Sequence, residues 1–64
     1  MSETITDATT GRIIAHVFAS HIPGTFNVYL PGKFDSSQPG TDIARNVGRA
    51  EVERAIGWAI RNSR

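Results

Sequence analysis

Residues 13–30, IIAHVFASHIPGTFNVYL, contain the two clearest strand patterns of the chain. Branched and aromatic side chains fill residues 13–18, and apolar side chains alternate strictly with Asn and Tyr in residues 26–30, patterns that are typical of β-strands. The connecting segment holds Pro23-Gly24, which suits a type II turn because proline presets φ and glycine accepts the positive φ of the next position. We therefore predict an antiparallel hairpin over these residues.

On either side of this hairpin the strand signals are weaker. Residues 3–8 are rich in threonine, which favours β-structure, and the Thr-Thr-Gly that follows can turn the chain back into the hairpin. Residues 31–32 and 39–40 are further Pro-Gly pairs and are predicted as turns. Residues 32–41 also have the composition of a loop, and we therefore predict a loop over residues 32–48.

Residues 42–48 at the end of this loop allow two interpretations. Ile43, Arg45 and Val47 alternate as in a strand, whereas Asp42 could cap a short helix. We favour a loop or a single helical turn here.

Residues 49–62 carry the clearest helix pattern of the sequence. Apolar residues recur there at steps of three and four and make one apolar face, formed by Val52, Ala55, Ile56, Ala59 and Ile60. The predicted fold is therefore α+β, with a three-stranded antiparallel β-sheet (β-β-β) packed on one C-terminal α-helix in a single domain, 1–64. The predicted strands are at about 3–8, 12–19 and 25–31, and the predicted helix is at about 49–62.

The size and composition of the chain exclude several classes of protein. A domain of 64 residues buries only roughly 60% of the surface of its unfolded chain, so a deep catalytic cleft is not expected. The sequence has no cysteine and no apolar run near the length of about 20 residues that a membrane span needs. We expect a cytoplasmic protein without a membrane partner, because small secreted domains are commonly stapled by disulfides.

A single helix can cover only one face of the sheet, which leaves the other face for function. If Phe26, Val28 and Leu30 face the helix, Asn27 and Tyr29 face outward. On the neighbouring strand, Ile13, Ala15 and Val17 are expected beneath the helix, and Ile14, His16 and Phe18 are expected outside. The candidate binding surface then comprises Arg12, Ile14, His16, Phe18, Asn27, Tyr29, Arg45 and Arg49. The alternative is that the faces are reversed, with Phe18 in the core and His16 half-buried.

These features favour a non-enzymatic binding module. Three strands followed by a helix also occur in DNA-binding modules, including the arm-binding domains of phage integrases, whose sheet enters the major groove. This order of elements is all that the chain shares with them, and its net charge of +1 is weak support. The first interpretation is a nucleic-acid-associated domain, and the alternative is a protein-interaction module or homodimer. Arginines clustered beside Tyr29 and His16 would favour nucleic acid, and scattered arginines would favour a protein partner.

No pattern in the sequence indicates an enzyme, a cofactor or a metal site. His16 and His21 lack neighbouring carboxylates, whereas metal sites need three or four convergent ligands, so both are expected to be exposed imidazoles. Ser20 beside His21 is not a catalytic triad. Phe34 is expected to pack under the edge of the core, and Gly57 is expected on the exposed side of the helix.

Overall fold

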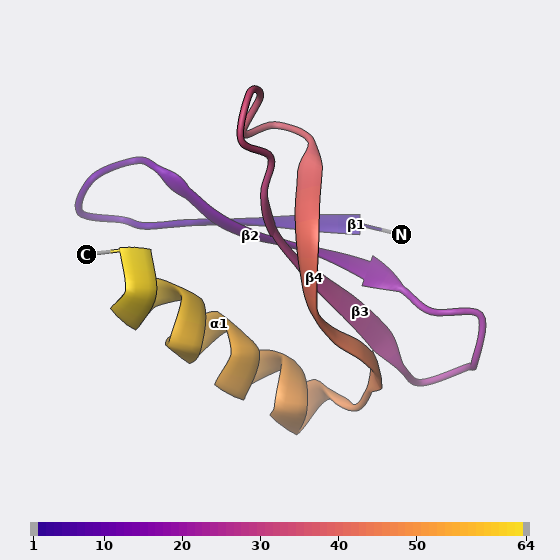
Figure 1. Cartoon of the computed structure of the whole chain (residues 1–64). Helices are drawn as coiled ribbons and strands as arrows, with labels where there is room; N and C mark the ends of the chain where they lie inside the picture. Colours follow the sequence, from indigo (N-terminus) through magenta and orange to yellow (C-terminus); the bar gives the residue numbers. More distant parts are fainter. Residues whose placement is uncertain (1, 64) are drawn as a thin grey trace.

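Four strands and one helix make up the chain in a computed structural model that describes residues 2–63 (Figure 1). The strands are β1 (Ser2–Thr6), β2 (Ile13–Ala19), β3 (Phe26–Pro31) and β4 (Pro39–Val47), and the helix is α1 (Arg49–Ser63). Each strand pairs antiparallel with the next, so the order in the sheet is β1-β2-β3-β4. The predicted antiparallel sheet on one C-terminal helix is confirmed, but the sheet has four strands instead of three.

The predicted hairpin of β2 and β3 is present, and its turn has the expected chemistry. The amide of Thr25 donates to the carbonyl oxygen of Ile22 at 3.1 Å, and Gly24 between them has a φ of 80°. A positive φ at the third position, after proline, is what a type II turn requires. Local sequence therefore determines this turn.

The fourth strand corrects the prediction that residues 32–48 are a loop. Residues 39–47 pair with β3, and Pro31 lies opposite Pro39, so only residues 32–38 connect the two strands. Two of the three Pro-Gly pairs are thus not the predicted turns. Proline is tolerated in β4 because β4 is an edge strand, where a missing backbone N–H can face solvent.

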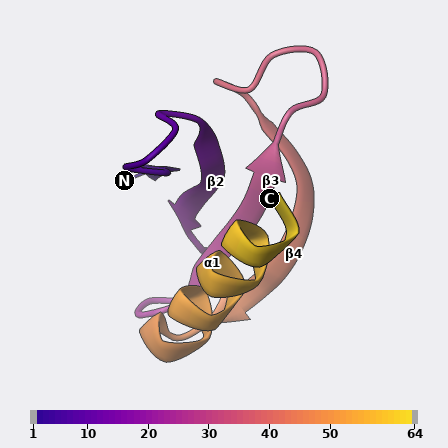
Figure 2. The ribbon, with the colours of Figure 1, turned by 90° about the vertical axis from the view of Figure 1, so that its left-hand side faces the viewer.

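The helix α1 lies along one face of the sheet and leaves the opposite face without a helix (Figure 2). The core between sheet and helix is small and aliphatic, and its six buried members are Ile14, Ala15, Val17, Val28, Val52 and Ala59. Phe26 and Leu30 pack against this cluster. The predicted sides of β3 and of Ala15 and Val17 on β2 are therefore confirmed.

Ile14 is the exception on β2, because it was expected to face outward but is only 3% exposed. On β1, the consecutive residues Ile5 and Thr6 pair with Ala15 and Ile13 of β2. Ile14, between these two, has no partner on β1 and is an extra residue in the ladder. A bulge of this kind breaks the strict alternation of side chains. Ile14 therefore belongs to the core and not to the candidate binding surface.

Gly57 lies in the middle of α1, where glycine costs about 1 kcal/mol relative to alanine. A Cβ added there would come within 4 Å of a single side-chain atom, Nη1 of Arg61 at 3.6 Å. We expect Gly57→Ala to raise the free energy of unfolding by about 0.5–1 kcal/mol, measured by urea denaturation. Gly24→Ala is the matched control and should have the opposite sign, because its φ of 80° penalises a Cβ. A less stable Gly57→Ala variant would contradict the prediction.

No helix in the described part of the chain is long and apolar enough to cross a membrane.

Candidate binding surface on the open sheet face

The sheet face opposite α1, called the open face here, carries the aromatic residues that the alternation predicts. Tyr29 pairs with His16, and Asn27 pairs with Phe18, which places all four side chains on the side away from Val28 and the helix. The rings of Phe18 and Tyr29 meet edge to face, with centroids 5.6 Å apart and planes at 83°. This geometry is favourable for an aromatic pair, and both residues remain partly exposed.

An open groove of about 370 Å³ runs beside this aromatic pair. We call it the aromatic groove, and it is lined by Phe18, Ala19, Asn27, Tyr29, Pro39 and Gly40. Sequence reasoning missed Pro39 and Gly40 because residues 39–40 were predicted as a turn. The alternation of residues 43–47 was the signal that could have placed β4 beside Tyr29.

Asn27 contributes to the groove but its carboxamide is already engaged. Its Oδ1 accepts a hydrogen bond from the backbone amide of Asn46 at 2.9 Å. Asn46 has a φ of 54°, a conformation that asparagine tolerates better than most residues, and its side chain accepts a hydrogen bond from the Ser20 hydroxyl. Asn27 therefore positions the end of β4 against β3.

His16 is buried, which corrects the expectation of an exposed imidazole. It is only 4% exposed, because the segment 32–38 folds over the open face at this point. Nε2–H of His16 donates to the carbonyl oxygen of Ser36 at 2.8 Å, and Nδ1 lies 3.5 Å from the hydroxyl oxygen of Thr4. A buried polar ring needs such partners. His16 therefore anchors the segment 32–38 to the sheet.

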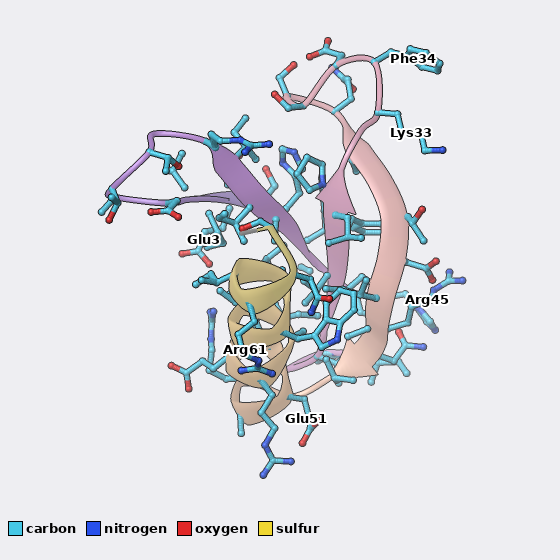
Figure 3. The ribbon with its side chains drawn as sticks, turned by 60° about the vertical axis from the view of Figure 1, so that its left-hand side comes forward. Glu3, Lys33, Phe34, Arg45, Glu51 and Arg61 are labelled. Atoms are coloured by element: carbon cyan, nitrogen blue, oxygen red, sulfur yellow. The ribbon has the colours of Figure 1, made fainter. Side chains whose placement is uncertain are left out.

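The segment 32–38, called the β3–β4 loop here, is held together by its own backbone. The amide of Gly32 donates to the carbonyl of Gln38 at 2.8 Å, and the amide of Gln38 donates to the carbonyl of Asp35 at 3.0 Å. At its tip Phe34 is 104% exposed and, with Lys33, projects away from the ribbon (Figure 3). The expectation that Phe34 packs under the core edge is therefore wrong, because the backbone hydrogen bonds turn it outward.

Asp35 stabilises this loop in its ionised form. The Ser37 hydroxyl and the Ser37 amide donate to its carboxylate at 2.6 Å and 3.0 Å, and these bonds lower the pKa of Asp35 below its ordinary value of 3.8. A carboxyl with a lowered folded pKa stabilises the loop above the unfolded pKa and loses this contribution as pH falls through the folded value.

We expect the NMR signal of the Ser37 amide to move as pH falls below about 3.8, following the titration of Asp35. In Asp35→Asn this pH-dependent movement should disappear, because the amide oxygen can accept the same bonds but does not titrate. Asp42→Asn is the control and should leave the movement unchanged. A chemical shift of the Ser37 amide that does not change with pH in the wild type would contradict the role of Asp35.

The candidate arginines are dispersed around the molecule. Arg45 pairs with Asp42 at 3.4 Å and extends on the side of β4 away from α1 (Figure 3). Arg49 pairs with Glu3 at 3.6 Å and lies over the ring of Phe26, 4.7 Å from its centroid, on the helix side of the sheet.

Arg12 is separate from both of these arginines. It lines a pocket of about 450 Å³ with Trp58 and Asn62, near the C-terminal end of α1. The structure therefore brings Phe18, Asn27 and Tyr29 together on the open face with His16 beneath the loop. It does not bring Arg12 or Arg49 to them.

His21 and the carboxylates lie outside the open face's aromatic pair. His21 is exposed, with its Nδ1 3.4 Å from the Ser20 hydroxyl. Within residues 2–63, no three side chains of His, Asp or Glu lie close enough together to hold a metal ion. The partly exposed pair of Phe18 and Tyr29 is the aromatic feature of the open face.

Comparisons of the chain with models of protein families, with curated proteins and with solved structures found no match.

Proposed function

We propose that this protein is a non-enzymatic binding module that holds an apolar or aromatic segment of a protein partner in the aromatic groove. The observation that carries the proposal is the pair Phe18 and Tyr29, which is partly exposed on a sheet face that no helix covers. Partly exposed aromatic side chains beside a groove are the residues that most often anchor a protein interface. The groove of about 370 Å³ offers room for one or two side chains.

The charges around the groove favour a protein over a nucleic acid. Asp42 lies opposite Tyr29 in the sheet, and the nearby Arg45 is paired with that carboxylate. Arg12 and Arg49 lie elsewhere. Nucleic-acid surfaces concentrate unpaired basic residues along the binding face, because neutralising phosphates supplies most of the affinity. A face that carries one balanced ion pair suits an uncharged segment better.

The small core supports the same conclusion. The fully buried side chains with the largest volumes are only Val28 and Val52, and the aromatic residues of the described chain remain outside the buried cluster. Domains of this size often gain stability by association. Covering Phe18 and Tyr29 with a partner would remove apolar surface from water that the monomer leaves partly exposed.

The test is a selection of peptides from a random library against the immobilised protein, followed by NMR titration of the selected peptide. We expect the largest shifts at the amides of Phe18, Ala19, Asn27 and Tyr29. Tyr29→Ala should weaken binding at least about tenfold, as expected for a central aromatic anchor. Trp58→Ala is the matched control, because it removes an exposed aromatic ring from α1 on the other side of the sheet. This control should bind like the wild type.

A parallel titration uses mixed-sequence duplex and single-stranded DNA at two salt concentrations. We expect no shifts at the aromatic groove with either DNA. Shifts there whose size falls steeply as salt rises would instead identify a nucleic-acid surface and overturn the proposal. Selected peptides whose affinity depends on Trp58 and not on Tyr29 would overturn it as well.

A further inference from the structure

We infer that the partner is a second copy of this chain, and that Phe34 of each copy inserts into the aromatic groove of the other in a two-fold symmetric dimer. The inference rests on the proposed function, because it names the occupant of the same groove. A two-fold interface uses one patch twice, so the patch must contain both a protruding group and a recess. The β3–β4 loop and the groove supply these two parts.

Phe34 is presented by an ordered loop. It is 104% exposed, although it is a large apolar side chain, and the loop beneath it is closed by the hydrogen bond between Gly32 and Gln38 at 2.8 Å. The bond from His16 to Ser36 at 2.8 Å ties the same loop to β2. Because these bonds already fix the backbone of the loop, binding through Phe34 costs little backbone conformational entropy.

The loop and the groove lie on the same side of the sheet. His16, which holds the loop, pairs with Tyr29 in the open-face register, and Tyr29 lines the groove. Phe34 points away from the sheet and from α1 (Figure 3), so it cannot fill the groove of its own chain in this conformation. A second copy facing the open face places the two loops and the two grooves opposite each other.

The chemistry of the groove matches a phenylalanine side chain. Phe18 and Tyr29 already use an edge-to-face contact, and their partly exposed rings offer further edges and faces to a third ring. Gly40 in the wall has no side chain, and Pro39 adds a flat apolar surface. The lining therefore favours an aromatic ring over a charged group.

The exposed area of the chain is larger than that of a typical monomer. Its accessible surface is 4456 Å², against roughly 4,000 Å² expected for a monomeric protein of 7.0 kDa. The excess of about 400 Å² per chain is surface that a second copy can cover, and twice this area stays below the roughly 1,000 Å² of a stable specific interface. We therefore expect a weak dimer that forms at high concentration.

The charges near the proposed interface do not oppose self-association. The loop carries Lys33 and Asp35, and Asp42 pairs with Arg45 on β4. Two acidic and two basic residues leave this region without net charge, so two identical faces can meet without electrostatic repulsion.

Sedimentation equilibrium from about 10 µM to about 1 mM tests the inference over the range of a weak interface. We expect the average mass of the wild type to rise from 7.0 kDa towards twice that value. Phe34→Ser should raise the dissociation constant at least about tenfold, and folding should be unaffected because the ring touches solvent only. Tyr29→Ala should have the same effect, whereas Trp58→Ala, the control, should dimerise like the wild type.

Mixing the two variants separates insertion of Phe34 from an indirect effect on the fold. In a mixed dimer, Phe34 of the Tyr29→Ala chain meets the intact groove of the Phe34→Ser chain, so one of the two contacts is restored. We expect an equimolar mixture to be heavier than either variant alone. Equal masses for the mixture and the separate variants would overturn the reciprocal arrangement.

Two further outcomes would overturn the inference without deciding the proposed function. One is a wild type that stays at 7.0 kDa throughout the range, and the other is a dimer that Phe34→Ser leaves intact. In both cases the titration with a selected peptide still tests the aromatic groove independently.

Discussion

Replacing Val52 by alanine is expected to lower the free energy of unfolding by about 2–3 kcal/mol, from the lost apolar transfer and the cavity left behind. Val52 is 0% exposed and is one of six residues in the buried cluster. The total stability of a small domain is about 5–15 kcal/mol, and often near the lower end. A single truncation of this kind therefore removes a large part of it.

Urea denaturation of Val52→Ala and Ile56→Ala measures this effect against a matched position on the same helix. From the sequence alone Ile56 belongs to the apolar face in the same way as Val52, and its larger side chain suggests the larger loss. In the structure Ile56 is only partly buried, so we expect Ile56→Ala to cost less than Val52→Ala. The reverse order would show that α1 is rotated on the sheet relative to the structure.

Gly40→Ala is expected to lower the free energy of unfolding by about 1–3 kcal/mol, the usual cost of forcing extra atoms into a packed site. A Cβ at Gly40 would lie 2.7 Å from the carbonyl oxygen of Pro31 and 3.1 Å from that of Leu30. Both are backbone atoms of β3, so the strands must separate to admit the methyl group. The substitution therefore weakens the pairing that holds β4 in the sheet.

Two measurements distinguish this effect from a general loss of stability. Amide hydrogen exchange should accelerate most along β4, because that strand loses its pairing with β3 first. Gly57→Ala serves as the glycine control and is expected to stabilise, since its added Cβ meets only the end of Arg61. An unchanged melting temperature for Gly40→Ala would mean that β4 does not approach β3 this closely.

The candidate site was predictable to the extent that it follows from strand alternation. Phe18, Asn27 and Tyr29 lie on the open face as their positions in β2 and β3 indicate, because successive side chains of a regular strand point to opposite faces. Ile14 does not follow this alternation, because a bulge in β2 opposite β1 turns its side chain towards the core. Whether a strand carries a bulge depends on its partner, which local periodicity does not describe.

The other corrections arise from contacts between residues far apart in the chain. His16 is buried because the carbonyl of Ser36, twenty residues later, receives its hydrogen bond. Phe34 is exposed because the same loop closes through its own backbone. The arginines are dispersed because Arg45 pairs with Asp42 within β4, whereas Arg49 at the start of α1 pairs with Glu3 on β1.

By itself the sequence determined the hairpin of β2 and β3 with its Pro23-Gly24 turn and the helix α1, and it left open which side of the sheet faces that helix. These features depend on interactions within a few residues, namely turn dihedral angles and the spacing of apolar side chains. Only the tertiary structure decided that residues 39–47 form a fourth strand, because their strand pattern is weak alone and becomes stable when β3 supplies hydrogen bonds. That pairing also built the wall of the aromatic groove and directed the β3–β4 loop over His16.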